Sequence, residues 1–277
     1  MKRPTDWLGG AAPLNEYRCL NREERHITAT LYSLMLTDRA GLRVLLEEVC
    51  GVPCAHGEAE EAAVWFEFTF LRDWWKALEG EEHKRSALRH LLGAVEPGTA
   101  DADPSAVTEG IARLHDTPLP ELNSLFSTRP SRTTLESPAR WSTDVILHSL
   151  RACPDLARRA ILLSWSFRIK PDVVVTIGSD CAVIFEAKWD SPEDRYRCPA
   201  IDLNRRQVQL QRDMFTRLLG LRPDRVYSVM LAKRRKTQRS RSAERIVSWP
   251  EAFGCFAEST APTVLAVLPD AAVARDA

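Results

Sequence analysis

Two carboxylates and a lysine near the middle of the chain are the residues best suited to chemistry. Asp172, Glu186 and Lys188 lie in two β-branched and aromatic runs that favour strands, and the turn-forming residues 178–180 separate these runs. If those three residues form the loop, Asp172 lies directly opposite Glu186, with Cβ atoms about 4.5–5.5 Å apart. Two carboxylates at that spacing can hold one hard divalent cation such as Mg²⁺. The pattern therefore predicts a metal site on a β-hairpin.

A cation beside a lysine suits hydrolysis of a phosphodiester bond. The cation acts as a Lewis acid on a phosphoryl oxygen and lowers the pKa of a bound water. Lys188 shares a face with Glu186 because side chains alternate along a strand. Its ammonium can orient the water or neutralise charge that develops on the phosphoryl group. A two-residue loop would instead place Asp172 opposite Phe185, so the hypothesis depends on the register of the hairpin.

The spacing of these residues resembles the signature of the PD-(D/E)XK superfamily, the restriction-endonuclease-like nucleases. Pro171-Asp172 is followed by Glu186-Ala187-Lys188, with Glu186 fourteen positions after Asp172. The resemblance implies a DNA nuclease that depends on Mg²⁺ (or Mn²⁺), with Asp172 and Glu186 as metal ligands and Lys188 as catalytic lysine. It implies an α/β fold with a restriction-endonuclease-like core, in which helices flank a central mixed β-sheet. The alternative is an edge hairpin whose charged side chains face water.

A helix is predicted after the hairpin, over residues 203–219, because apolar residues recur there at helical spacing. Relatives in the superfamily carry a glutamine on this helix near the metal or the scissile phosphate. Gln209 and Gln211 both fit that pattern, and we take Gln209 as the catalytic candidate with Gln211 as the alternative. Either could instead be a helix-forming residue on a solvated face. Residues 225–232 and 246–249 predict two further strands, the second leading into a helix.

A helix near the start of the chain is the second candidate source of an acidic residue. Asn21 is a suitable N-cap, and Glu24 three residues later completes a capping-box pattern. The superfamily core opens with a helix whose acid completes the site, so we assign Glu24 to it, with Glu23 as the alternative. Both acids could instead favour only the helix dipole. The hairpin lies more than a hundred residues further on, so either an insertion intervenes or a segment such as 141–144 supplies the leading element.

The chain is long enough for an enlarged domain or for a domain with an insertion. We predict residues 1–55 to be N-terminal helices that pack on the nuclease core. Residues 56–140 are then a mainly helical insertion with loops, and residues 141–277 the core. Within the insertion, the aromatic segment 62–78 favours either a strand followed by a helix or one buried helix.

Charge is zero overall but unevenly distributed along the chain. Between Arg195 and Arg245 there are fifteen Lys and Arg residues against four Asp and Glu residues, an excess of eleven positive charges. The densest part is a predicted loop with five basic residues: Lys233, Arg234, Arg235, Lys236 and Arg239. Such a loop is expected to bind DNA phosphates without reading sequence. It could instead be a solvated loop or contact the acidic half of the chain.

Composition places the chain among soluble globular proteins, with 44% hydrophobic and 27% charged residues. No apolar run approaches the roughly 18 residues of a membrane span, and the first residues lack the apolar region of a signal peptide. Seven scattered cysteines favour a reducing compartment. We therefore expect a cytoplasmic protein that does not contact a membrane. No glycine-rich phosphate loop occurs, so no ATPase activity is expected.

The hypothesis that follows is a cytoplasmic DNA nuclease of prokaryotic or phage type. By analogy with stand-alone nucleases of this size, we expect a role in defence against foreign phage or plasmid DNA. Its partners would be DNA and either other subunits of a defence system or a second copy in a homodimer. One alternative is a nuclease of repair or recombination. Another is a non-catalytic nucleic-acid-binding or assembly subunit with the same fold, although the intact triad argues against it.

Overall fold

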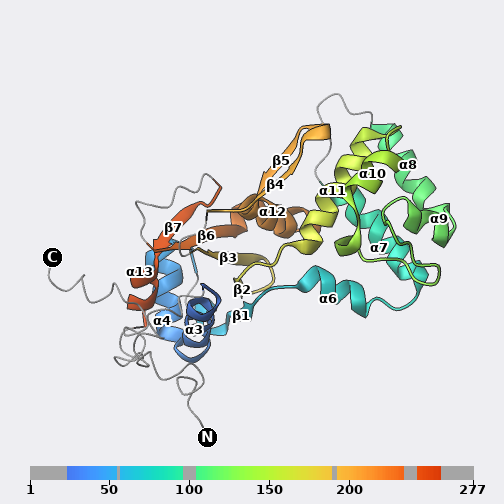
Figure 1. Ribbon diagram of the computed structural model, residues 1–277. Coiled ribbons are helices and arrows are strands. Elements are labelled where there is room, and N and C mark those ends of the chain that lie inside the picture. Colours follow the sequence, from blue (N-terminus) through green and yellow to red (C-terminus); the bar gives the residue numbers. More distant parts are fainter. Residues whose placement is uncertain (1–23, 55–56, 96–103, 189–191, 234–241, 257–277) are drawn as a thin grey trace, which may run out of the picture. The chain divides into compact units, whose positions relative to one another are not determined.

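The computed structural model describes residues 24–54, 57–95, 104–188, 192–233 and 242–256. The chain divides into two compact units. The first comprises Met1–Glu67, Asp172–Pro192 and Tyr227–Ala277, and we call it the sheet unit. The second comprises Phe68–Pro171 and Glu193–Val226, and we call it the helical unit. Figure 1 labels the strands of the first and the helices of the second.

The sheet has five strands in the order β1-β2-β3-β6-β7. Their bounds are Ala63–Phe66 (β1), Val173–Ile177 (β2), Cys181–Ala187 (β3), Val226–Ala232 (β6) and Arg245–Ser248 (β7). Strands β1, β2 and β3 pair antiparallel, whereas β6 and β7 pair parallel, so the sheet is mixed. The α/β class with a mixed sheet flanked by helices, predicted from the sequence, is confirmed at this level. The aromatic segment after residue 62 forms a strand followed by the helix α6 (Phe70–Ala77).

The hairpin of β2 and β3 closes through a three-residue loop. Ile177 pairs with Cys181, and Val173 at the other end pairs with Phe185. The loop residue Gly178 has a φ of 59°, in the left-handed region that a residue without Cβ adopts at little cost. The three-residue loop expected from the sequence is therefore confirmed, and with it the register of the hairpin.

Helices cover one face of the sheet in the sheet unit. They are α3 (Glu24–Thr37), α4 (Arg39–Val44), the π-helix η1 (Leu45–Val49), the short α5 (Glu58–Glu61) and α13 (Trp249–Gly254). Their apolar side chains pack against alternate strand residues, including Val173, Val175, Phe185 and Ala187. Because side chains alternate along a strand, Glu186 is directed to the opposite face from these residues.

The helical unit is organised around α11 (Pro154–Arg168), of which eleven residues are buried. Its remaining helices are α6, α7 (Glu81–Ala94), α8 (Pro104–Asp116), α9 (Leu119–Ser124), α10 (Thr143–Ser149) and α12 (Gln207–Asp213), with the π-helix η4 (Met214–Leu218) after α12. The unit also contains a two-stranded ribbon, β4 (Arg195–Cys198) with β5 (Leu203–Arg206), and the 3₁₀ turns η2 (Pro138–Arg140), η3 (Pro199–Ile201) and η5 (Pro223–Arg225). No helix in the described part of the chain is both long and apolar enough to span a membrane.

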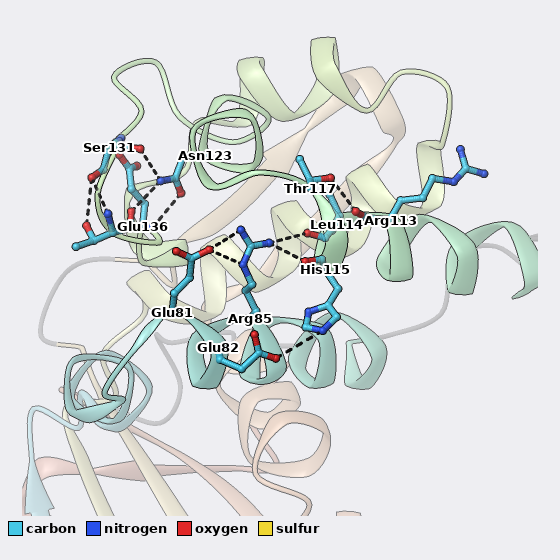
Figure 2. Close-up of polar contacts among 11 residues, drawn as sticks. Glu81, Glu82, Arg85, Arg113, Leu114, His115, Thr117, Asn123, Ser131 and Glu136 are labelled. Atoms are coloured by element: carbon cyan, nitrogen blue, oxygen red, sulfur yellow. Dashed lines mark hydrogen bonds and ion pairs between the residues drawn. The ribbon is translucent and has the colours of Figure 1, made fainter.

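Two buried arginines bind the carbonyl ends of helices in this unit. Arg85 donates to the backbone oxygens of Leu114 at 3.3 Å and His115 at 2.8 Å, at the end of α8 (Figure 2). The same guanidinium pairs with Glu81 at 2.6 Å. Arg159 on α11 donates to three backbone oxygens at the end of α7. The last carbonyls of a helix have no partner within it, so each arginine satisfies groups that burial would otherwise leave unbonded.

The irregular segment after α9 is held by one buried asparagine. Asn123 donates through Nδ2 to the backbone oxygens of Ser131 and Thr134, both at 2.8 Å. Its Oδ1 accepts from the backbone N–H of Glu136 at 3.1 Å, and the Glu136 carboxylate accepts from the Ser131 N–H at 2.8 Å (Figure 2). These bonds satisfy backbone groups that would be paired in a helix or a sheet, neither of which this segment forms.

Two expectations about organisation differ from the structure. The predicted helix over residues 203–219 begins only at Gln207, because the first four residues pair with β4 as a strand. The compact units also do not follow the expected boundaries after residues 55 and 140. Strand β1 comes from the segment that we assigned to the insertion. It belongs to the sheet unit because it pairs with β2, more than a hundred residues further along the chain.

Candidate active site

The two carboxylates of the predicted site lie opposite each other at one end of the β2–β3 hairpin. Asp172 comes directly before β2, and the register continues from the Val173–Phe185 pair to place it opposite Glu186. Its Oδ2 accepts a hydrogen bond from the backbone N–H of Ala187 at 2.8 Å. This bond ties the carboxylate of one strand to the backbone of its neighbour. The cross-strand arrangement expected from the sequence is therefore present.

Glu186 and Lys188 form a buried ion pair on the middle strand of the sheet. The Lys188 Nζ lies 2.8 Å from Glu186 Oε1, and the two residues are 6% and 1% exposed. The backbone N–H of Lys188 donates to the carbonyl of Leu231 at 2.8 Å, which holds the residue against β6. Ionised groups are seldom buried to this extent unless they are paired. This burial excludes the alternative of an edge hairpin whose charges face water.

The electrostatic environment of Lys188 is set by carboxylates from three segments. Burial lowers the pKa of its ammonium, but Glu186, through its charge and its hydrogen bond, together with the charges of Glu24 and Asp172 raises the pKa above its usual value. The ammonium therefore stays protonated across the physiological range.

Glu24 belongs to this cluster through the first turn of α3. The helix packs against β1 and β3, and Glu24 is the first residue of its described part. This residue is half-buried, and its charge acts on Lys188. A part for Glu24 in catalysis stays a prediction. The alternative acid, Glu23, and the expected N-cap Asn21 lie outside the described residues.

A further carboxylate, Glu67, lies beside the site and was not selected from the sequence. It directly follows β1, and its backbone N–H donates to the carbonyl of Asp172 at 2.8 Å. Its φ of 50° lies in the left-handed region, which residues other than glycine seldom adopt. Its carboxylate pairs with Arg25 of α3 at 2.7 Å. Residues 63–66 were ambiguous between helix and strand, and only a strand assignment would have placed an acid next to Asp172.

The cluster has the donor chemistry for a hard divalent cation. No group of three or more His, Cys, Asp and Glu side chains in the described ranges is arranged to hold a metal ion. The hairpin offers a smaller set, the carboxylates of Asp172 and Glu186, and oxygen ligands are those that Mg²⁺ prefers. With Glu24, three carboxylates act on a single ammonium, so negative charge is in excess. The residues present therefore fit a bound Mg²⁺ or Mn²⁺.

The other assigned residues belong to the helical unit, follow β6 in the sequence or lie outside the described residues. Gln209 is exposed on α12 of the helical unit, where its Oε1 accepts from the backbone N–H of Arg206 at 2.9 Å, whereas Gln211 is buried. A catalytic part for either glutamine stays a prediction. Lys233 is half-buried directly after β6. The other four residues of the basic loop lie outside the described residues: Arg234, Arg235, Lys236 and Arg239.

Comparison with known proteins adds no relative from which a role could be transferred. No family model, no curated protein and no solved structure gives a significant match to this chain.

Proposed function

We propose that this protein is a metal-dependent DNA nuclease of the PD-(D/E)XK type. The observation that carries the proposal is the end of the β2–β3 hairpin, where Asp172 lies opposite Glu186 and Lys188 lies 2.8 Å from Glu186. The register, the burial and the raised pKa of Lys188 agree with the roles that the residue pattern implies. Buried, strongly coupled ionisable groups occur preferentially at functional sites.

Each side chain has a distinct part in this proposal. Asp172 and Glu186 would hold Mg²⁺ or Mn²⁺, which supplies Lewis-acid stabilisation of the phosphodiester when bound. Lys188 stays cationic and can neutralise the charge that develops on the phosphoryl oxygens, a stabilisation that is strong in a water-poor site. Glu24 adds negative charge near the ammonium, which keeps it protonated and correctly placed. Gln209, or Gln211 in its place, is proposed as an auxiliary residue that contacts the substrate.

The proposed substrate is DNA, and the proposed context is defence against foreign DNA. The basic segment from Lys233 to Arg241 would bind phosphates without reading sequence. A test replaces four basic residues by alanine: Lys233, Arg234, Arg235 and Lys236. The slope of log affinity against log salt for duplex DNA should then become less steep by roughly three to four. An unchanged slope would mean that the loop does not contact DNA. The defence context rests on analogy and follows only if cleavage is found.

Cleavage of supercoiled plasmid, with Mg²⁺, with Mn²⁺ or with EDTA, tests the proposal. We expect cleavage with metal only. Asp172→Asn, Glu186→Gln and Lys188→Met should each lower the rate by about 10²–10³-fold, the usual effect of removing one group that stabilises the transition state. Asp180→Asn is the matched control, because Asp180 is an exposed acid in the loop of the same hairpin. Cleavage by Asp172→Asn at the wild-type rate would contradict the assignment.

A non-catalytic nucleic-acid-binding subunit is the second candidate. The observation that favours it is Lys188 itself, which pairs directly with Glu186 and so holds one of the proposed ligands. DNA binding without cleavage in either metal, together with unchanged binding in the Glu186→Gln variant, would support this candidate over the nuclease.

A further inference from the structure

The ribbon of β4 and β5 in the helical unit has two chemically different faces. Its register pairs Arg195 with Arg206 and Arg197 with Asn204, and these four side chains share one face because directly paired and alternate residues do so. The other face is formed by the Tyr196–Arg205 and Cys198–Leu203 pairs. One face is therefore strongly basic, and the other is mostly apolar.

The apolar face is the one that packs on the helical unit. Cys198 and Leu203 are 3% and 1% exposed, and the ring of Tyr196 lies 5.7 Å from that of Trp165 on α11. This packing fixes the ribbon on a rigid helix and leaves the basic face outward, where Arg195 and Arg197 are exposed. A two-stranded ribbon is marginal by itself, so the packing is what holds the arginines in place.

The arginines of the ribbon differ in how their charges are balanced. Arg206 pairs with the buried Glu193 at 3.4 Å, and Arg205 lies 3.9 Å from Asp213. Arg195 and Arg197, in contrast, form no ion pair or side-chain hydrogen bond with any residue that the structure describes.

The acidic residues nearest the ribbon in sequence lie at its ends and do not neutralise the positive charge in its middle. The exposed Asp194 precedes β4, and Asp202 lies at the turn with a φ of 46°. Both lie at the ends of the ribbon, so the uncompensated positive charge is concentrated along β4.

We propose that this basic face binds duplex DNA, as a second contact surface besides the basic segment that follows β6 in the sequence. Four-residue strands are about 13 Å long. The major groove of B-form DNA is about 12 Å wide and admits a two-stranded β-ribbon. Two exposed guanidiniums at alternate positions of one strand match a polyanion in charge, and arginine binds phosphates or guanine edges in bidentate fashion. The choice of DNA rests on the proposed nuclease function, whereas the surface itself does not depend on cleavage.

Binding can be measured separately from cleavage. The full chain with the additional change Glu186→Gln is titrated in EDTA against a labelled 20-base-pair duplex at several KCl concentrations. Each phosphate contact contributes about −0.9 to the slope of log affinity against log salt. Arg195→Ala/Arg197→Ala should therefore flatten the slope by about two and lower affinity by roughly 60-fold at 0.1 M salt. Thermal stability should not change, because both side chains are exposed.

Two control variants separate a specific surface from net charge. Arg113→Ala/Arg222→Ala removes the same charge from the same unit, at exposed arginines that pair with Glu109 and Asp224. We expect that variant to keep the wild-type slope, and Arg195→Lys/Arg197→Lys to keep most of it. The proposal would be overturned if Arg113→Ala/Arg222→Ala lost as much affinity and slope as Arg195→Ala/Arg197→Ala. It would also be overturned if the slope of Arg195→Ala/Arg197→Ala were unchanged.

The choice of duplex DNA is tested with a second pair of probes. Single-stranded DNA and an RNA hairpin of similar length are titrated against the same variants. We expect the ribbon variant to lose more affinity for duplex DNA than for either probe. A larger loss on RNA or on the single strand would contradict duplex DNA as the ligand. Plasmid cleavage by the chain without the Glu186 change reports separately on the nuclease, so either proposal can fail without the other.

Discussion

Replacing Lys188 by methionine tests whether the buried ion pair is only a structural contact or part of a metal site. The substitution keeps an unbranched, flexible stem of similar shape but removes the ammonium. The Glu186 carboxylate, with an exposed side-chain fraction of only 2%, is then left without its partner. Removing one partner of a buried pair typically destabilises a protein by about 3–5 kcal/mol. We therefore expect a loss of this size, or roughly 6–20 °C in Tm. Lys76→Met is the control, because that lysine is 79% exposed and its pair with Asp73 contributes under about 1 kcal/mol.

The double variant Lys188→Met/Glu186→Gln should recover much of the loss, because no unpaired charge then remains in the interior. The sign of the pH dependence follows from the raised pKa of Lys188. The stabilisation is fully present below the ordinary lysine pKa of 10.5 and is lost as the pH rises through the higher folded value. The difference in free energy of unfolding between wild type and Lys188→Met should therefore be constant near neutral pH. It should become smaller only in strong alkali.

Magnesium distinguishes the two interpretations of the pair. If Asp172 and Glu186 are metal ligands, Mg²⁺ supplies the positive charge that Lys188→Met lacks, and the variant should be stabilised by about 2.7 kcal/mol at 100 times its Kd. Chemical denaturation in 10 mM MgCl₂ or in EDTA measures this effect. A Lys188→Met protein as stable as wild type would refute the electrostatic reasoning. A destabilised variant that gains nothing from Mg²⁺ or Mn²⁺ would refute the metal site.

Four other expectations concern packing and burial inside each unit. Gly41→Ala should destabilise the sheet unit by about 1–3 kcal/mol, because the new Cβ would overlap the Phe256 ring. Denaturant titration measures this loss. Gly93→Ala on α7, where an added Cβ would meet no atom within 4 Å, should instead be neutral or stabilising by up to about 1 kcal/mol. Arg85→Met should lower the free energy of unfolding of the helical unit by about 2–3 kcal/mol, because two carbonyls at the end of α8 lose their donor. The unit should then be cleaved faster in limited proteolysis, and an unchanged cleavage rate would contradict this expectation. Burial raises the pKa of the Cys50 thiol from 9.0 to about 12. Alkylation of Cys50 by iodoacetamide at pH 8 should therefore be about a thousandfold slower in the folded chain than in urea, because the thiolate is the reactive form. Mass spectrometry measures the rate.

Local sequence was sufficient for the elements whose signals lie close together in the chain. The β2–β3 hairpin follows from two β-branched runs and a three-residue turn, and its register follows from that loop length. Strands β6 and β7 and the helix α3 were likewise predicted from periodicity and flanking residues. These elements include the three residues of the proposed triad and Glu24. That is why the candidate site could be located from the sequence.

Elements that depend on distant partners could not be predicted in this way. Residues 203–206 have helical neighbours in sequence, yet they form a strand because β4 provides hydrogen bonds for them. Glu67 lies beside Asp172 only because β1 pairs with β2 across more than a hundred residues. Propensity is a weak preference of a few tenths of a kcal/mol per residue, and such pairing outweighs it.

The sequence by itself determined which charged residues meet at the end of the hairpin, because the alternation of side chains and the loop length are local properties. Only the tertiary structure decided that these charges are buried. Strand β3 lies in the middle of the sheet, with β2 on one side and β6 on the other, and Glu186 and Lys188 are buried there. Two charges that would be an ordinary surface pair on an edge strand become strongly coupled there, because the interior screens their interaction far less than water does.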